Sequence, residues 1–564
     1  MNLKQIMLSL AAATAMFASA QNQGYQDGIE YFKADQFDNA KEILSNTLNA
    51  PGTDRAEALY YLGAIALHDG DAATARKNFE EGIALDPKNG LNYVGLGAIA
   101  LKEGNAKAAE DYFKQATKAQ NKAFVHVAIA RAYYNADKVA YAKEYDKFMD
   151  NAVRKDKKEP SYYVMRGDAL RDRAIAAGTD EGTALIGEAA TEYNQAIYFN
   201  PKSPDAYVKY SRVYAKANPQ YAIDKLKELN ELMPNSAMAQ RELAERYYDN
   251  KEWTKAAREY GTYIQNPNHF IKDEERYAVL LYSGDEIDRC MDIVNQGLSK
   301  DPNSQQLRRL EMLCLEHKKD YAGAKASADK YFKIPGAKFT GNDYASYANI
   351  LGEMGDVDGE IAARIKATEV SPDDRDLYNA LSQSNFEEGN KYLKADSLAE
   401  ARRYFEPAVA AWEKFVALAP DGKPSDVDYV NLALRYQSLA NACEGDSIAQ
   451  KANYAKAKEA FNKAIAIDPT YYVPYQRLGR LTMLENGGKP NEETLAAFSK
   501  VIEILNANPE NLTKEKNAYN EAYVRMASYY MGQKDTEKAK ECYLKMLELD
   551  PENQALKDYI EKMK

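Results

Sequence analysis

The chain has 564 residues, which is too long for one compact core, because such cores stop growing at about 250–300 residues. Hydrophobic residues make up 45% of it and charged residues 28%, so there is enough apolar surface to fold, and a disordered chain is excluded. With 74 basic and 85 acidic residues the net charge is −11, which argues against a protein dedicated to nucleic acid or to anionic membranes. We therefore expect several domains or an elongated repeat array.

The first 20 residues have the pattern of a secretory signal peptide. Lys4 precedes an apolar run from Ile6 to Ala18, and Ala18-Ser19-Ala20 forms an Ala-x-Ala cleavage site before Gln21. The run is shorter than the roughly 20 residues of a membrane-spanning helix, and the first cysteine, Cys290, is too far away to carry a lipid anchor. The sequence predicts an exported protein, periplasmic or secreted, that is not a lipoprotein and has no transmembrane segment after cleavage.

One residue pattern returns after 34 positions. Leu59-Tyr60-Tyr61-Leu62-Gly63 aligns with Tyr93-Val94-Gly95-Leu96-Gly97. Three further pairs keep the same spacing, namely Gly70 and Gly104, Ala75 and Ala109, and Phe79 and Phe113. Each copy is typical of a helix, a glycine-containing turn and a second helix, and a proline closes it because proline cannot continue a helix interior.

These residues resemble the tetratricopeptide repeat (TPR), and about thirteen or fourteen copies recur along nearly the whole chain. The resemblance implies an all-α fold, a right-handed solenoid of stacked antiparallel helix pairs that binds proteins or peptides. The prolines that close successive copies are Pro51, Pro87, Pro201, Pro234, Pro267, Pro302, Pro372, Pro420, Pro469, Pro509 and Pro551.

The spacing of the copies predicts the organisation of the chain. The stretch 268–338 carries the weakest copies, which leaves open one continuous superhelix or two arms about a bend near Ile334-Pro335-Gly336. About ten extra residues around Gly178 predict either a lengthened helix hairpin or a loop. The predicted order is a signal peptide (1–20), an N-terminal TPR array (21–267), degenerate helical repeats (268–338), a C-terminal TPR array (339–553) and an extension or cap (554–564).

In the TPR family the first helix of each repeat lines a concave groove, so the resemblance implies a set of groove residues in three successive repeats. Their mixture of charges with an aromatic ring suits an extended peptide or a partner helix, and the alternative is an ordinary solvated helix face. The lysines and asparagines with which some relatives hold chaperone tails are missing. The candidate partner-binding residues are Asp168, Arg171, Asp172, Arg212, Lys216, Arg241, Glu245, Tyr248 and Asp249.

The sequence predicts no enzyme, no cofactor and no metal site. Gly95–Ala100 formally fits a dinucleotide fingerprint, but it lies inside a predicted helix, whereas the fingerprint needs a strand before the glycines. Asp356 and Asp358 lack the rest of a calcium loop and are expected at a helix start. None of the four histidines has a second ligand at helical spacing; they are His68, His126, His269 and His317.

Four cysteines are too few for a disulfide scaffold, and a bridge between Cys290 and Cys314 stays open. Our leading hypothesis is a scaffold that binds an unidentified protein or peptide in the bacterial cell envelope, in assembly, secretion or uptake. The alternative is a carbohydrate- or cell-wall-associated binding protein, which tyrosines clustered in the groove would favour.

Overall fold

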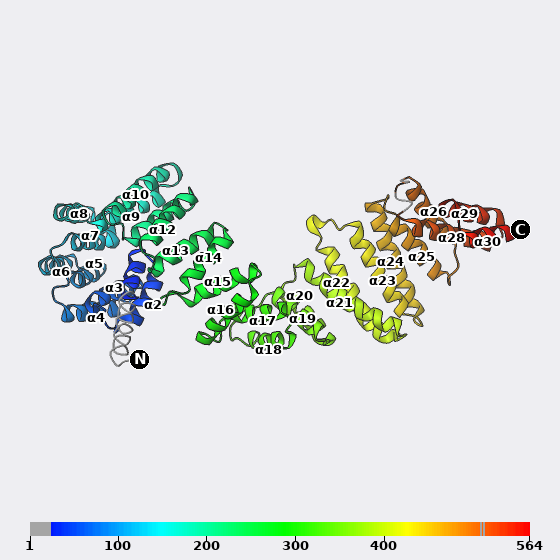
Figure 1. Ribbon diagram of the computed structural model, residues 1–564, viewed down its shortest axis with the longest axis horizontal. Helices are drawn as coiled ribbons and strands as arrows, with labels where there is room; N and C mark the ends of the chain where they lie inside the picture. Colours follow the sequence, from blue (N-terminus) through cyan, green and yellow to red (C-terminus); the bar gives the residue numbers. More distant parts are fainter. Residues whose placement is uncertain (1–23, 508–509, 511–513, 564) are drawn as a thin grey trace, which may run out of the picture. The chain divides into compact units, whose positions relative to one another are not determined.

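The computed structural model describes residues 24–507, 510 and 514–563. The predicted signal peptide (1–20) therefore lies outside the described residues. Within them every regular element is a helix, and no strand occurs. Consecutive helices pack as antiparallel pairs, which confirms the predicted all-α TPR solenoid (Figure 1).

The chain forms two compact units, the first ending at Leu310 and the second beginning at Glu311. The junction lies inside the stretch 268–338 that has the weakest repeats, and helix α17 (Gln305–His317) runs across it. The finer domain boundaries stay predictions.

Unit 1 starts with a helical segment over residues 24–33. Its further helices are α2 (Phe37–Thr47), α3 (Arg55–His68), α4 (Ala72–Leu85), α5 (Gly90–Lys102), α6 (Ala106–Ala119), α7 (Ala123–Asp137), α8 (Ala142–Lys155), α9 (Pro160–Ala177), α10 (Thr179–Phe199), α11 (Pro204–Tyr214), α12 (Pro219–Leu232), α13 (Ala237–Asp249), α14 (Trp253–Tyr263), α15 (Ile271–Ser283) and α16 (Ile287–Lys300).

Unit 2 continues the same alternation of paired helices. Its elements are α18 (Tyr321–Tyr331), α19 (Gly341–Glu353), α20 (Val357–Val370), α21 (Arg375–Lys394), α22 (Leu398–Ala417), the 3-10 turn η1 (Pro420–Gly422), α23 (Asp426–Ala442), α24 (Ser447–Ile467), α25 (Tyr472–Glu485), α26 (Glu492–Asn506), α28 (Lys516–Gly532), α29 (Thr536–Leu549) and α30 (Gln554–Lys562).

Small residues stand where the two helices of a pair approach each other. A Cβ atom added to Gly63 on α3 would lie 2.5 Å from the Phe79 ring on α4, and one added to Gly97 on α5 would overlap the Phe113 ring on α6. Phe79 and Phe113 are almost fully buried. The aromatic ring of the second helix therefore fills the space that the glycine leaves open.

Short polar side chains begin the helices, as the sequence predicts. The carboxylate of Asp356 accepts a hydrogen bond from the Gly359 amide and caps α20, while Asp358 stands in its first turn. The expected helix start at these acids is confirmed. Gly95–Ala100 lies inside α5, which confirms that it is a helical stretch and not a dinucleotide loop.

The extra residues around Gly178 lengthen a helix pair. Helices α9 and α10 have 18 and 21 residues, and Gly178 joins them with a φ of +84°, a conformation that favours glycine. Of the two expectations, the lengthened hairpin is therefore confirmed. All four cysteines are buried thiols. Among the described residues, no helix is both long and apolar enough to cross a membrane.

We expect Gly97→Val to destabilise the protein by about 3 kcal/mol, because the new side chain would overlap the Phe113 ring in a packed interior. The matched control is Gly187→Val on α10, where a Cβ would meet nothing within 4 Å and the cost should stay within about 0.5 kcal/mol. Urea unfolding followed by circular dichroism measures both. Equal midpoints for the two variants would contradict the packing argument.

Candidate interaction site

The nine predicted groove residues all lie on, or next to, the first helices of three repeats in unit 1. Helix α9 carries Asp168, Arg171 and Asp172, and α11 carries Arg212, with Lys216 two residues beyond its end. The other four, Arg241, Glu245, Tyr248 and Asp249, lie on α13.

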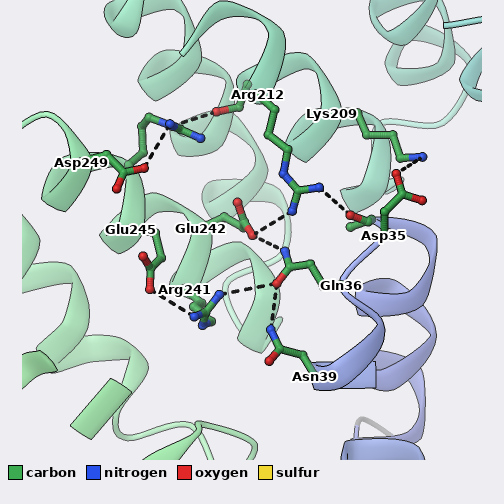
Figure 2. A network of polar contacts seen from close by, with 12 residues as sticks. Asp35, Gln36, Asn39, Lys209, Arg212, Arg241, Glu242, Glu245 and Asp249 are labelled. Carbon is green, nitrogen blue, oxygen red and sulfur yellow. Dashed lines mark hydrogen bonds and ion pairs between the residues drawn. The ribbon is translucent and has the colours of Figure 1, made fainter. Parts of the chain in front are cut away.

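A segment of the same chain lies against these helices. We call residues 24–47 the N-terminal hairpin. Its hydrogen bonds to α11, α13, α15 and the turn before α15 join residues that are separated in sequence by 178 to 241 positions. Figure 2 shows Asp35, Gln36 and Asn39 of the hairpin pointing toward Lys209, Arg212 and Arg241. In unit 1 the groove face of these repeats is therefore already in contact with a helical hairpin.

The middle of the hairpin is held by both backbone and side-chain contacts. Arg212 Nη1 donates to the Ala34 carbonyl oxygen at 2.6 Å. Gln36 donates its amide to the buried Glu242 and accepts from Arg241 Nη1 at 3.5 Å (Figure 2). The first helices α11 and α13 thus bind a backbone carbonyl, that of Ala34, and a side-chain carboxamide, that of Gln36.

Asp35 links the hairpin to the buried charges of the groove. Its carboxylate lies 3.1 Å from Lys209 Nζ and 3.5 Å from Arg171 Nη1. Lys209 has 1% of its side chain exposed. Its buried ammonium group therefore depends on the carboxylates of Asp35 and Asp168.

A second row of contacts holds the outer side of the hairpin. Asn268 Nδ2 donates to Asp27, Lys272 Nζ donates to Asn39, and Ser236 Oγ donates to Glu30, all at 2.7 Å. The ring of Tyr31, which is fully buried, packs edge-on against Phe270 with centroids 5.5 Å apart. The polar contacts therefore surround an apolar centre.

Asp168 is the centre of a buried ion cluster in α9. It accepts from Lys209 Nζ at 2.8 and 2.9 Å, from Tyr193 OH at 3.0 Å, and it lies 3.0 Å from Arg131 Nη2. Burial by itself raises the pKa of Asp168, but the charges of Lys209 and Arg131 and the Lys209 hydrogen bond outweigh burial and lower it to about 2. Asp168 is consequently an internal anchor of the repeat stack.

Arg241 and Glu245 belong to a second ion cluster, between α13 and α15. Arg241 donates to both carboxylate oxygens of Asp273 at 2.6 and 3.1 Å and lies 3.1 Å from Glu245. Glu245 also pairs with Arg276, which lies across the Tyr248 ring at 4.8 Å from its centroid. These contacts tie two successive repeats together.

The remaining candidates stand at the edge of this network. Lys216 and Asp249 are exposed, and Tyr248 is half-buried with Trp253 edge-on at 5.2 Å. Asp172 lies 3.2 Å from Arg171 and accepts from Tyr134 OH at 3.4 Å. The Asp249 carboxylate accepts from Arg246 Nη1 at 3.3 Å. We call Lys216, Tyr248 and Asp249 the rim.

The structure thus sorts the predicted residues into two groups. The first group takes part in the ion clusters or the hairpin contacts and consists of Asp168, Arg171, Asp172, Arg212, Arg241 and Glu245. The second group is the rim, which makes no hydrogen bond or ion pair to the hairpin among the described residues. Sequence reasoning missed Lys209, Glu242 and Asp273, which are buried partners of this network. In the sequence each is a charged residue on the first helix of its repeat, like many exposed ones, so no signal marks it as buried.

No metal centre accompanies these clusters in the part of the chain that the structure describes. There, no group of three or more His, Cys, Asp or Glu residues is arranged to hold a metal ion. Both ion clusters pair each buried charge with an opposite charge, an arrangement typical of structural ion pairs.

Tetratricopeptide-repeat family models match residues 56–89, 92–122, 446–471 and 521–553. The chain therefore contains tetratricopeptide repeats in both units. This agrees with the helix-pair geometry of the fold. A comparison with curated proteins finds no match.

Solved structures with similar folds include repeat proteins of several origins. The C-terminal part of a TPR repeat-containing protein from Cytophaga hutchinsonii is 21% identical, covers 50% of this chain and 98% of its own, and has a TM-score of 0.38. A tetratricopeptide repeat protein from Parabacteroides merdae is 16% identical over 49% and 97%, with a TM-score of 0.29. Yeast Tom70 is 13% identical over 78% and 97%, with a TM-score of 0.26. At these values the similarity carries no functional information.

We expect Asp168→Asn to destabilise the protein by about 3 kcal/mol, because it takes the nearest anion from the buried Lys209. The double variant Asp168→Asn, Lys209→Met should recover most of that loss. Urea unfolding of the parent, the two single variants Asp168→Asn and Lys209→Met, and the double variant measures this. Because the pKa of Asp168 is lowered from 3.8 to about 2, its contribution is complete above pH 4 and disappears as the pH falls toward 2. A double variant no more stable than Asp168→Asn would contradict this pairing.

The N-terminal hairpin should loosen as the pH rises. Burial first, and then the charge of Asp27, raise the pKa of Glu30 from 4.5 to about 8, whereas Ser236 and Lys33 lower it and Asp205 raises it. A raised pKa stabilises the docked hairpin below pH 4.5, and this contribution is lost as the pH rises through about 8. We expect hydrogen exchange of residues 24–47, corrected for intrinsic rates, to be faster at pH 9 than at pH 6.

Glu30→Gln is the matched test of this loosening, because glutamine keeps the shape and cannot ionise. The variant should protect residues 24–47 equally at both pH values, and better than the parent at pH 9. Equal protection of the parent protein at pH 6 and pH 9 would show that Glu30 does not control the contact.

Proposed function

We propose that this chain is a non-enzymatic scaffold that binds proteins or peptides in the bacterial cell envelope. Tetratricopeptide repeats support the interaction role, since this fold typically acts as a binding module. The signal-peptide pattern of residues 1–20 supports the location, and assembly, secretion or uptake are the processes in which such a scaffold would act.

The proposal rests on the hydrogen bonds between the groove face of α11 and α13 and the N-terminal hairpin. Arg212 donates to the Ala34 carbonyl, a group that any helix end offers. Glu242 and Arg241 bind the Gln36 carboxamide, a group that only glutamine and asparagine side chains carry. The same face can therefore recognise a second helix or peptide beside the hairpin, where the rim residues Lys216, Tyr248 and Asp249 stand.

The competing function, binding of carbohydrate or cell wall, draws its support from 43 tyrosines in the sequence. A tyrosine platform for a sugar must expose ring faces, and many of these rings are core residues. The fully buried tyrosines are Tyr25, Tyr31, Tyr193, Tyr207, Tyr247, Tyr260, Tyr263 and Tyr331. Their burial favours a packing role for much of the tyrosine content.

The triple variant Lys216→Glu, Tyr248→Ala, Asp249→Lys should lose its partner. We expect in-cell crosslinking of the parent protein, followed by mass spectrometry of the envelope fraction, to enrich one or a few proteins, with the chain itself beginning at Gln21. The variant should reduce that enrichment at least tenfold. Urea unfolding of the variant accompanies the capture, because Tyr248 is half-buried against Trp253 and Asp249 pairs with Arg246.

The chain offers a control with the same three residue types on second helix α12. Lys227, Tyr221 and Asp224 have 45% to 57% of their side chains exposed, so Lys227→Glu, Tyr221→Ala, Asp224→Lys makes the same chemical change elsewhere. If the rim variant and the control variant enrich the crosslinked proteins equally, the rim is not the binding site. Capture of glycans in place of protein, in a parallel pull-down, would favour the carbohydrate alternative.

A further inference from the structure

A hollow of about 520 Å³ lies on unit 1, away from the N-terminal hairpin contacts. Helix α6 supplies Lys118, helix α8 supplies Asn151, Arg154 and Lys155, and the turn before α7 supplies Asn121. No acidic side chain lines it. The hollow therefore presents cations and amide groups from three separate segments to solvent.

The charge of this region departs from that of the whole chain. Residues 102–158 contain thirteen lysines and arginines against eight acidic residues, although the chain as a whole has a net charge of −11. Lys114, at the edge of the hollow, lies 3.2 Å from Glu110, so its charge is partly compensated. Lys118, Arg154 and Lys155 have no carboxylate within 4 Å among the described residues, and their charge is available to a ligand.

His126 gives the hollow a buried polar wall. It is 7% exposed, its Nε2 lies 3.0 Å from Asn121 Oδ1, and its Nδ1 has no hydrogen-bond partner. Burial first, and then the charge of Lys155, lower the pKa of His126. With Nε2 donating to Asn121 Oδ1, the buried Nδ1 carries the lone pair, so the imidazole is an uncharged polar part of the wall beside the cations.

Helix dipoles account for only part of the basic cluster. Lys118 stands in the last turn of α6, and Arg154 and Lys155 stand in the last turn of α8, where the helix dipole favours cations. That effect favours a cation at each helix end. It does not require both ends to converge on one hollow with two asparagines and a histidine.

We propose that this hollow binds a phosphate group, either free inorganic phosphate or the phosphate of an anionic lipid headgroup. Phosphate offers several acceptor oxygens and up to two negative charges, which match one guanidinium, two ammonium groups and the asparagine amides better than the two oxygens of a carboxylate. The site lies on α6, α7 and α8 and is independent of the scaffold function of the groove.

The test follows the imidazole of His126 by NMR in the full chain with labelled histidine. Titration with inorganic phosphate near 0.15 M salt should shift the His126 resonance, assigned with His126→Gln, and leave those of His68, His269 and His317 in place. In Lys118→Glu, Lys155→Glu the phosphate concentration for half the shift should rise at least tenfold. The conservative Lys118→Arg, Lys155→Arg should keep the parent's affinity.

A matched control distinguishes specific phosphate binding in the hollow from general attraction of phosphate to a positively charged surface. Lys143→Glu, Lys147→Glu makes the same charge change on α8 at exposed positions outside the hollow. At 0.15 M salt, screening over about 8 Å should leave phosphate binding by this control within twofold of the parent. No shift of His126 with phosphate, or an equal loss in both charge-reversed pairs, would overturn the proposal.

The source of the phosphate is decided with vesicles of neutral phospholipid, with and without an anionic phospholipid. Flotation only with the anionic vesicles, lost in Lys118→Glu, Lys155→Glu and kept in the control pair, assigns the site to a lipid headgroup. A His126 shift with inorganic phosphate and no flotation assigns it to free phosphate. Flotation that the control pair also loses, without a His126 shift, counts against the hollow.

Discussion

The structure depends on close contact between neighbouring helices at glycine residues, which have no side chain to hold the helices apart. The ring of Phe79 on α4 fills the space beside Gly63 on α3 and also that beside Gly95 on α5. One aromatic ring therefore sets both the distance within a repeat and the distance to the next repeat. Repeating this joint along the chain fixes the angle at which helix pairs stack, and with it the direction in which the first helices face.

The stacking angle brings the N-terminal hairpin onto repeats that follow it by about two hundred residues. Once there, it is held by charges that would be expensive to bury alone. Lys209 is stable in the interior because Asp168 and Asp35 approach it from two different segments. The groove face of unit 1 is thus organised by internal contacts first, and the surface left for a partner is the rim beside them.

Local features of the sequence were sufficient for the fold and insufficient for the site. The 34-residue spacing and the helix start at Asp356 follow from neighbours in sequence, and both are confirmed. The contacts of Arg212 and Arg241 with the hairpin were not predictable, because they depend on small rotations summed over several repeats. Lys209 was missed because, between Val208 and Tyr210, it resembles any lysine on a helix surface, and only its burial reveals its role.

The distance in sequence between the hairpin and its contacts has a consequence for the order in which the chain matures. Residues 24–47 leave the ribosome before Asn268 and Lys272, which follow more than 220 positions later. At about 5–20 residues per second, the apolar face around Tyr31 waits roughly 10–45 seconds for its docking surface. During that time the apolar side chains around Tyr31 lack their docking surface, and exposed apolar surface of this kind is what makes folding chains prone to aggregate.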